Sequence, residues 1–392
     1  MRSLLTSLLF CCSMLFIFSC TKSIGDSSPD GRGDFALSAG SSGGGGGNNN
    51  GGGTAGVITA GEWNDATNWD FWKSLLQRDT IKTFPALWGF YTENRISILL
   101  RDAQGRLVHD AKLTLTGASS YSAVTDNYGQ AELYPGLFTA GYSPVSYGLK
   151  AEYHGQTFDL GTVPAGTTTL EKSLPIVKTV VKTVDVAFVV DATGSMGDEI
   201  SYLKTELRDV INRAGAQLPG TQLRMSSVFY RDRGDDYVVR PFNFTTSASQ
   251  LSSFINNQDA GGGGDFPEAV DEGLDEAVNR LSWSSAAINR IIFLILDAPA
   301  HQTDEVRSRL KQVIATAQQK GIRIIPVSAS GINRETEFFL RFLALSTNGT
   351  YVFITNDSGV GAPHLQPTVG AYQVEFLNNL MVRLITKYGL DR

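Results

Sequence analysis

The sequence contains little cysteine. Its three cysteines, Cys11, Cys12 and Cys20, all lie within the first twenty of 392 residues. The rest of the chain therefore has no disulfide, no cysteine metal ligand and no thiolate nucleophile. It also lacks any run of five basic residues, and its formal net charge is −6, so we expect no nucleic-acid partner. Beyond residue 20, no segment has the length and apolar character expected of a transmembrane helix.

The N-terminus has the pattern of an export signal. Arg2 precedes an almost continuous apolar stretch at residues 4–18, which is short for a membrane span and typical of a signal-peptide core. The stretch ends in Ile17-Phe18-Ser19-Cys20, which resembles the bacterial lipobox. That resemblance implies a signal peptide at residues 1–20 and lipidation of Cys20, in preference to a plain signal peptide cleaved nearby. Thr21 then favours the outer membrane of a Gram-negative bacterium, with the protein on its periplasmic or its outer face.

The next two segments differ sharply in composition. Residues 21–58 are rich in Gly, Ser, Asn and Asp, and such a segment cannot bury enough apolar surface to fold, so we expect a disordered tether. Residues 59–94 are rich in tryptophan and are expected to be helical. Trp69, Trp72 and Leu76 are spaced to share one helical face. We expect this face to pack on the following domain, because an exposed aromatic docking surface is uncommon.

Residues 95–177 alternate apolar and polar side chains between turns, a pattern typical of short strands. Ile96, Ile98 and Leu100 mark one strand, and Leu113 and Leu115 mark another. The pattern predicts a small all-β sandwich domain. The segments RDAQGRLVHDAKLTLTG and TDNYGQAELYPG resemble the carboxypeptidase-regulatory, transthyretin-like domains, and the resemblance implies a spacer or stabilising module.

Residues 178–392 contain long apolar runs separated by helical stripes. Val184–Val190, Arg290–Leu296 and Ile322–Val327 are typical of strands buried on both faces of a parallel sheet. Apolar residues at helical spacing lie between them, and a last stripe ends the chain. The alternation predicts an α/β fold with a doubly wound, mostly parallel sheet flanked by helices. We expect this domain to fold on its own.

Oxygen-bearing side chains follow these strands, at the sheet edge where α/β proteins bind ligands. Asp191, Thr193 and Ser195 follow the first strand, Asp265 follows a run of four glycines, and Asp297 ends the RIIFLIL strand. Hard cations prefer carboxylate and hydroxyl ligands. The expected metal is therefore Mg²⁺, or Mn²⁺ or Ca²⁺, rather than Zn²⁺.

The segment VVDATGSM resembles the metal-ion-dependent adhesion site (MIDAS) of von Willebrand factor A (VWFA) domains. The resemblance spans roughly residues 183–385 and implies a Rossmann-like fold with Asp191, Thr193 and Ser195 as metal ligands. GGGGDFPEAVDEGL places Asp265 where the family usually has a threonine, and FLILD supplies Asp297. FYRDRGDDYV and DAPAH resemble a bacterial subgroup of these domains.

Other interpretations of the site residues remain open. Asp191 alone would also suit a helix cap, and Asp265 with Glu268 would also form a capping box. Asp297 at the end of a buried strand favours a cation, because an unpaired buried carboxylate is costly. The remaining residues near the site are expected to be peripheral. His301 and His364 are expected to be exposed, and Arg231 pairs with a site carboxylate or has a surface role.

The family resemblance implies binding rather than catalysis. The metal shell would be completed by an acidic side chain of a protein partner, in cell adhesion or scaffolding at the cell envelope. An alternative is a phosphotransferase of the haloacid-dehalogenase type, with Asp191 as nucleophile and Mg²⁺ as cofactor. That chemistry needs a lysine and a second acidic pair, whereas Asp297 is followed by Ala-Pro-Ala. A structural lipoprotein with a non-functional metal site is the third possibility.

Overall fold

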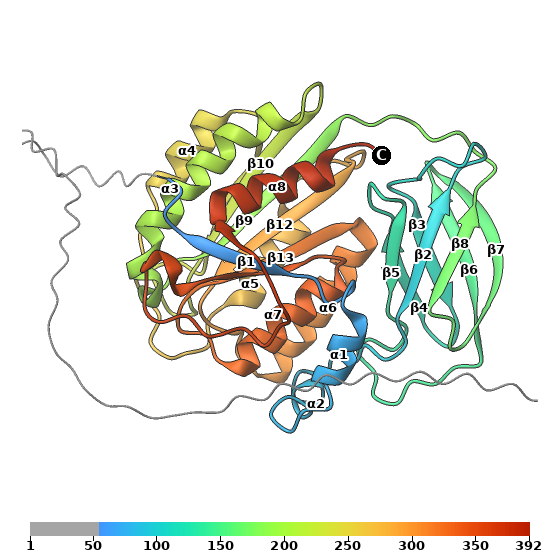
Figure 1. The fold of residues 1–392 in the computed structure, drawn as a ribbon, viewed down its shortest axis with the longest axis horizontal. Helices are drawn as coiled ribbons and strands as arrows, with labels where there is room; N and C mark the ends of the chain where they lie inside the picture. Colours follow the sequence, from blue (N-terminus) through green and yellow to red (C-terminus); the bar gives the residue numbers. More distant parts are fainter. Residues whose placement is uncertain (1–54) are drawn as a thin grey trace, which may run out of the picture. The chain divides into compact units, whose positions relative to one another are not determined.

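An eight-stranded mixed sheet organises the C-terminal part of the chain (Figure 1). Across the sheet the order is β11 (Val239–Thr245), β10 (Gln222–Tyr230), β9 (Thr183–Asp191), β12 (Asn289–Leu296), β13 (Ile322–Ser328), β14 (Tyr351–Ile354), β1 (Thr59–Trp63) and β15 (Val374–Phe376). The five adjacent strands β10, β9, β12, β13 and β14 pair in parallel with one another. Strands β11, β1 and β15 pair antiparallel with their neighbours. The sheet is therefore mostly parallel, as the apolar runs predicted.

Helices cover both faces of this sheet because its strands are apolar on both sides. In β9, Val186 and Phe188 contribute to one core, whereas Ala187 and Val189 contribute to the other. The first core packs against α3 (Gly197–Ala214), α4 (Ala248–Asn256) and α8 (Leu377–Gly389). The second packs against α5 (Val270–Asp275), α6 (Asp304–Lys320) and α7 (Arg334–Ser346). Figure 1 shows these two layers of helices around the sheet.

Strand β1 joins the C-terminal sheet from a distant part of the sequence. It pairs antiparallel with β14 on one side and with β15 on the other. Its start is held by Glu206 of α3, which accepts hydrogen bonds from the backbone N–H groups of Gly56, Val57 and Ile58 at 2.9–3.2 Å. The segment 59–94, expected to be helical throughout, thus begins with a strand. The predicted start of the C-terminal domain at residue 178 therefore leaves out one strand of its sheet.

The remainder of that segment contains two short helices, and its buried tryptophans pack on α7 rather than on the following domain, where the sequence predicted this packing. It forms α1 (Trp69–Leu75) and α2 (Phe84–Trp88). Trp72 is fully buried and stacks on Phe338 of α7, with ring centroids 5.7 Å apart. Trp88 is also buried and stacks on Phe339. The tryptophans therefore stabilise the helical layer of α7.

Residues 96–173 form two further sheets with a core of their own. One contains β5 (Gln130–Leu133), β2 (Ile96–Arg101) and β8 (Thr169–Ser173), and the other contains β4 (Ser120–Val124), β3 (Lys112–Thr116), β6 (Ser146–Tyr153) and β7 (Gln156–Pro164). The buried side chains of Ile96, Ile98 and Leu100 in β2 and of Leu113 and Leu115 in β3 belong to one core, which fills the space between the two sheets. The strands lie where the sequence predicted them, and their assignment to a β-sandwich domain stays a prediction. The likeness to transthyretin-like domains stays a prediction.

The computed structural model describes residues 55–392. The expected signal peptide, the lipidated Cys20 and nearly all of the expected tether lie outside the described residues. None of the helices between residues 55 and 392 combines the length and apolar character needed to cross a membrane.

Candidate metal site

The loop after β9 brings three predicted ligands onto one turn. Asp191 is fully buried at the end of the strand. The backbone N–H and the hydroxyl of Thr193 both donate to Asp191 Oδ1, at 2.9 and 2.7 Å. The Ser195 hydroxyl lies 3.3 Å from the Thr193 hydroxyl and is exposed. The three side chains therefore converge immediately before α3 begins.

Asp297 joins them from the neighbouring strand. It follows β12, which pairs in parallel with β9. Asp297 is only 4% exposed, and its Oδ1 has no hydrogen-bond partner among the described residues. Burial raises the pKa of Asp191 to about 7, and repulsion from Asp297 adds to the shift. Burial also raises the pKa of Asp297 to about 6, partly opposed by the Ser195 side chain. Two such carboxylates are costly to ionise without a cation.

Glu268 is a site residue that the sequence analysis did not assign to the metal. It is 3% exposed, and its Oε2 also has no partner among the described residues. A Cβ placed on Gly263, which has φ +75°, would lie 2.9 Å from Glu268 Oε1 and 3.4 Å from Thr193 Cβ. The glycine thus lets the loop pass close to both side chains. Burial raises the pKa of Glu268 to about 9, and repulsion from Asp191 is the next cause.

The capping-box interpretation of Asp265 and Glu268 is wrong. Helix α5 begins at Val270, with Ala269 at its N-cap position and no side-chain cap. Glu268 was overlooked because the sequence motif suggested this cap. Its place directly after the glycine run and Asp265 was the available signal for a role at the site.

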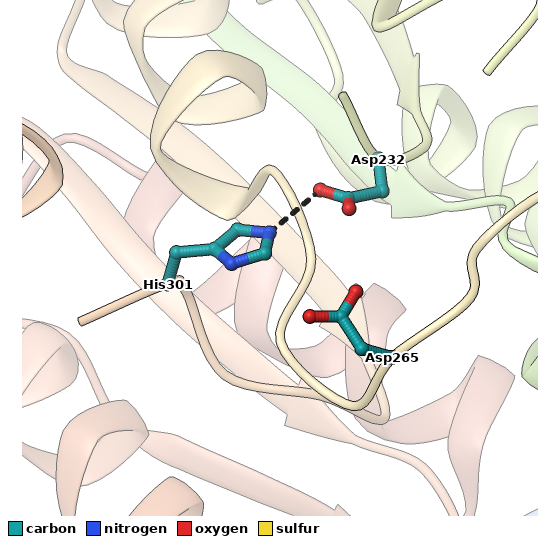
Figure 2. Close-up of side chains that lie close together, drawn as sticks. All are labelled: Asp232, Asp265 and His301. Carbon is teal, nitrogen blue, oxygen red and sulfur yellow. Dashed lines mark hydrogen bonds and ion pairs between the residues drawn. The ribbon is translucent and has the colours of Figure 1, made fainter. Parts of the chain in front are cut away.

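Asp265 belongs to a second group of side chains. It is exposed, and its carboxylate lies with those of Asp232 and with the His301 ring, all ligand atoms being within 4.8 Å of one another. Figure 2 shows the three side chains pointing toward one another. Asp265 also lines a pocket of about 460 Å³ together with Ser195, Glu268, Asp297 and the Gly262–Gly264 loop. Asp265 is therefore the residue of the second group that also borders the pocket of the first.

The peripheral residues differ in part from expectation. His301 is half-buried, with Nε2 2.8 Å from Asp232 Oδ1. His364, expected to be exposed, is buried, and its Nε2 lies 3.5 Å from Glu199 Oε1. Arg231 donates to the backbone carbonyl of Asp259. Its guanidinium also lies 3.9 Å from Asp236 Oδ2, and its side chain is only 12% exposed, so the surface role considered for Arg231 does not hold.

The residues present fit a divalent cation. Within residues 55–392, Asp297 Oδ1 and Glu268 Oε2 are buried acceptors without a donor, and Asp191, Thr193 and Ser195 supply further oxygens beside them. An all-oxygen donor set is what Mg²⁺ and Ca²⁺ prefer. A dication in this pocket would favour the ionised form of each carboxylate and so offset the cost of burying them.

Comparison with known families identifies the fold that carries this site. Residues 185–362 match the model of the von Willebrand factor A domain family. Residues 185–362 form a von Willebrand factor A domain. The von Willebrand A domain contains every site residue described above, from Asp191 to Asp297 and His301. The FYRDRGDDYV and DAPAH segments lie inside it as well.

Two curated relatives match part of the chain. An ariadne-like RING finger protein of Acanthamoeba polyphaga mimivirus is 32% identical over 34% of this chain, and an alpha-protein kinase of Dictyostelium discoideum is 32% identical over 31%. The chain spans only 13% and 19% of the lengths of these relatives.

Two solved structures show weaker similarity. Proximal thread matrix protein 1 of the mussel byssus has 16% identity and a TM-score of 0.35, covering 52% of this chain and 45% of its own. BatB of Bacteroides thetaiotaomicron has 14% identity and a TM-score of 0.33, covering 53% of this chain and 96% of its own.

Proposed function

We propose that the von Willebrand A domain binds a divalent cation through Asp191, Thr193, Ser195 and Asp297, and that this cation holds a protein partner. The observation that carries the proposal is the buried Asp297 carboxylate, whose Oδ1 has no donor among the described residues and which lies close enough to repel Asp191. Mg²⁺ is the expected ion, with Mn²⁺ and Ca²⁺ as alternatives. It prefers six oxygen ligands and keeps several waters, so protein side chains leave room in its shell.

The open side of the pocket suits an acidic side chain of a partner. Ser195 is exposed there, and Phe266, 43% exposed, provides apolar surface beside the metal ligands. A carboxylate replacing a metal-bound water would link the two proteins. Asp191, Asp297 and Glu268 together would exceed the charge of one dication and weaken this attraction. We therefore assign Glu268 a contact to the ion through water.

Binding is favoured over phosphoryl transfer by the way Asp191 is held. Its Oδ1 accepts two hydrogen bonds from Thr193, and its Oδ2 lies 3.3 Å from the donating hydroxyl of Tyr230. Both oxygens are thus oriented by neighbours, as expected for a metal ligand with a fixed position. A nucleophilic carboxylate would instead need a free oxygen facing its substrate.

The expected lipid anchor would locate this binding at the cell envelope. Cys20 would attach the protein to the cell envelope, and the glycine-rich segment after it would separate the folded domains from the membrane surface. We propose adhesion or scaffolding at the outer membrane, on its periplasmic or outer face. A structural lipoprotein with an inactive site predicts no metal-dependent partner.

The proposal is tested by capture from envelope extracts under matched conditions. The chain from Thr21 onward is immobilised and exposed to the extract with Mg²⁺ or with a chelator. We expect one or more proteins to be retained only with Mg²⁺, and to be lost with Asp191→Ala. Asp79→Ala, a surface aspartate paired with Lys82, is the control and should behave like the wild type. Equal retention in chelator and in Asp191→Ala would contradict the proposal.

A further inference from the structure

We propose that Asp232, Asp265 and His301 form a second divalent-cation site beside the first, selective for a transition metal such as Zn²⁺. The three residues come from separate segments: the loop after β10, the glycine-rich loop before α5, and the loop after β12. Their ligand atoms lie within 4.8 Å of one another (Figure 2). The site also accounts for the FYRDRGDDYV and DAPAH segments, because each contributes one of its residues.

Backbone hydrogen bonds hold the loops that carry Asp232 and Asp265. Asp235 Oδ2 accepts from the backbone N–H of Asp232 at 3.0 Å and from that of Gly263 at 2.9 Å. This one carboxylate therefore fixes the glycine-rich loop against the loop after β10. Asp232 itself is buried, with 8% exposure.

The loop after β12, which carries His301, is also held by backbone hydrogen bonds. The backbone N–H of Glu268 donates to the Pro299 carbonyl at 2.9 Å, and Glu268 forms a parallel bridge with Ala300. His301 follows directly, and its Nε2 lies 2.8 Å from Asp232 Oδ1. The site is thus largely assembled before any ion binds.

Glu268 supplies an independent indication of a ligand here. Its side chain is only 3% exposed, and its Oε2 has no hydrogen-bond partner among residues 55–392. The pocket that it lines contains Asp265 as well as Ser195 and Asp297. Repulsion from Asp232 acts on Glu268 together with that from Asp191 and Asp297. Glu268 therefore lies near carboxylates of both groups.

The number of carboxylates also favours more than one cation. An ion bound to Asp191 and Asp297 neutralises those two carboxylates, and leaves Asp232, Asp265 and Glu268. The nearby arginines are engaged elsewhere: Arg233 pairs with Asp271 at 2.6 Å, and Arg231 donates to the Asp259 carbonyl. A second dication would offset most of this remaining negative charge.

The donor atoms distinguish the two sites. The first offers only oxygens and suits Mg²⁺, whereas an imidazole nitrogen with two carboxylates suits Zn²⁺, Co²⁺ or Mn²⁺. Metal binding at the second site requires no protein partner. The second site therefore goes beyond the proposed function, and its occupancy can be measured separately.

The test is a Zn²⁺ titration of the chain from Thr21 onward, with Mg²⁺ held at saturation. We expect one Zn²⁺ per chain in the wild type. His301→Ala and Asp265→Asn should each weaken Zn²⁺ binding by more than about tenfold, in line with losses on disturbing metal sites. Asp265 is exposed, so its variant tests the site without risk to folding. His154→Asn, on the β-sandwich, is the matched control and should bind like the wild type.

Co²⁺ provides a spectroscopic check, because a four-coordinate protein site gives visible absorption bands much stronger than those of hydrated Co²⁺. His301→Ala should weaken these bands and Asp191→Ala should retain them. Unchanged Zn²⁺ affinity in both His301→Ala and Asp265→Asn would overturn the second site. Zn²⁺ binding lost in Asp191→Ala but kept in His301→Ala would assign the zinc to the first site and overturn the proposal. Retained Zn²⁺ binding without any Mg²⁺ binding would instead refute only the proposed function.

Discussion

Asp65 and Arg341, 276 positions apart in the sequence, form a buried ion pair. Arg341 Nε donates to Asp65 Oδ2 at 2.9 Å and Nη2 donates to Oδ1 at 2.5 Å. The two residues are 4% and 1% exposed. The pair joins the segment after β1 to α7 of the von Willebrand A domain, and so fixes an N-terminal segment onto a C-terminal helix.

Removing one partner of this pair should be strongly destabilising. Asp65→Ala leaves the Arg341 charge buried without its main partner, a change that costs about 3–5 kcal/mol of unfolding free energy in comparable cases. Urea denaturation of residues 55–392 measures it. Lys82→Met, which removes an exposed pair with Asp79, is the control and should have little effect. Equal stability of Asp65→Ala and wild type would show that the pair does not hold these segments together.

A fragment starting at residue 178 should fail to fold, in contrast to what the sequence alone suggested. It lacks β1, which lies between β14 and β15, and lacks Trp72 and Trp88, which cover Phe338 and Phe339. We expect residues 178–392 to aggregate or remain unfolded, and residues 55–392 to unfold cooperatively. Far-UV circular dichroism of both fragments tests this. A soluble, cooperatively folded 178–392 fragment would restore the original boundary.

The apo domain should lose stability as the pH rises. Carboxyl groups titrate near pH 4 in an unfolded chain, whereas the pKa of Asp297 is raised to about 6 and that of Asp191 to about 7. The folded state therefore holds protons that the unfolded state has released, and the free energy of unfolding falls between about pH 4 and pH 7.

Thermal unfolding in chelator at about pH 5 and about pH 8 measures this effect. Mg²⁺ should stabilise more at the higher pH, because it binds the ionised carboxylates. The double variant Asp191→Asn/Asp297→Asn should show a smaller pH dependence. A wild-type domain more stable at about pH 8 than at about pH 5 in chelator would contradict the assignment.

Membrane attachment should depend on Cys20. The lipobox resemblance places the lipid on this residue, and several buried acyl chains, at about 0.8 kcal/mol per CH₂, make a stable anchor. Cys20→Ser should move the protein from the membrane to the soluble fraction, whereas Cys11→Ser should not. Fractionation and immunoblotting compare the two variants. Unchanged membrane association and processing of Cys20→Ser would refute lipidation there.

The regular elements were predictable because their patterns are local. The apolar runs correspond to β9, β12 and β13, and the stripe ending at Gly321 corresponds to α6, whose C-cap glycine has φ +63°. Because parallel strands end at the same edge of a sheet, the sequence also predicted that Asp191 and Asp297 would lie close together. These features depend on neighbours a few residues apart or on a general rule of the fold.

The remainder depended on contacts that no local pattern encodes. Strand β1 has the sequence Thr-Ala-Gly-Glu-Trp. It is too short and too mixed in polarity to suggest that it belongs to a sheet completed by β14 and β15 near the C-terminus. Glu268 resembled a helix-cap residue, and His301 resembled an exposed loop residue. Only the meeting of three loops shows that Glu268 is buried beside Asp191 and that Asp232, Asp265 and His301 form a group.

Stabilisation by Mg²⁺ tests the central claim most directly. An ion that binds only the folded state raises the free energy of unfolding by RT ln(1 + [L]/Kd), about 2.7 kcal/mol at a hundredfold excess over Kd. Scanning calorimetry of residues 55–392 should show this rise with Mg²⁺ and its reversal by chelator. Asp191→Ala should fold without metal and show no rise, whereas Asp79→Ala should respond like the wild type. A wild-type protein indifferent to millimolar Mg²⁺, Mn²⁺ and Ca²⁺ would contradict the metal-dependent mechanism.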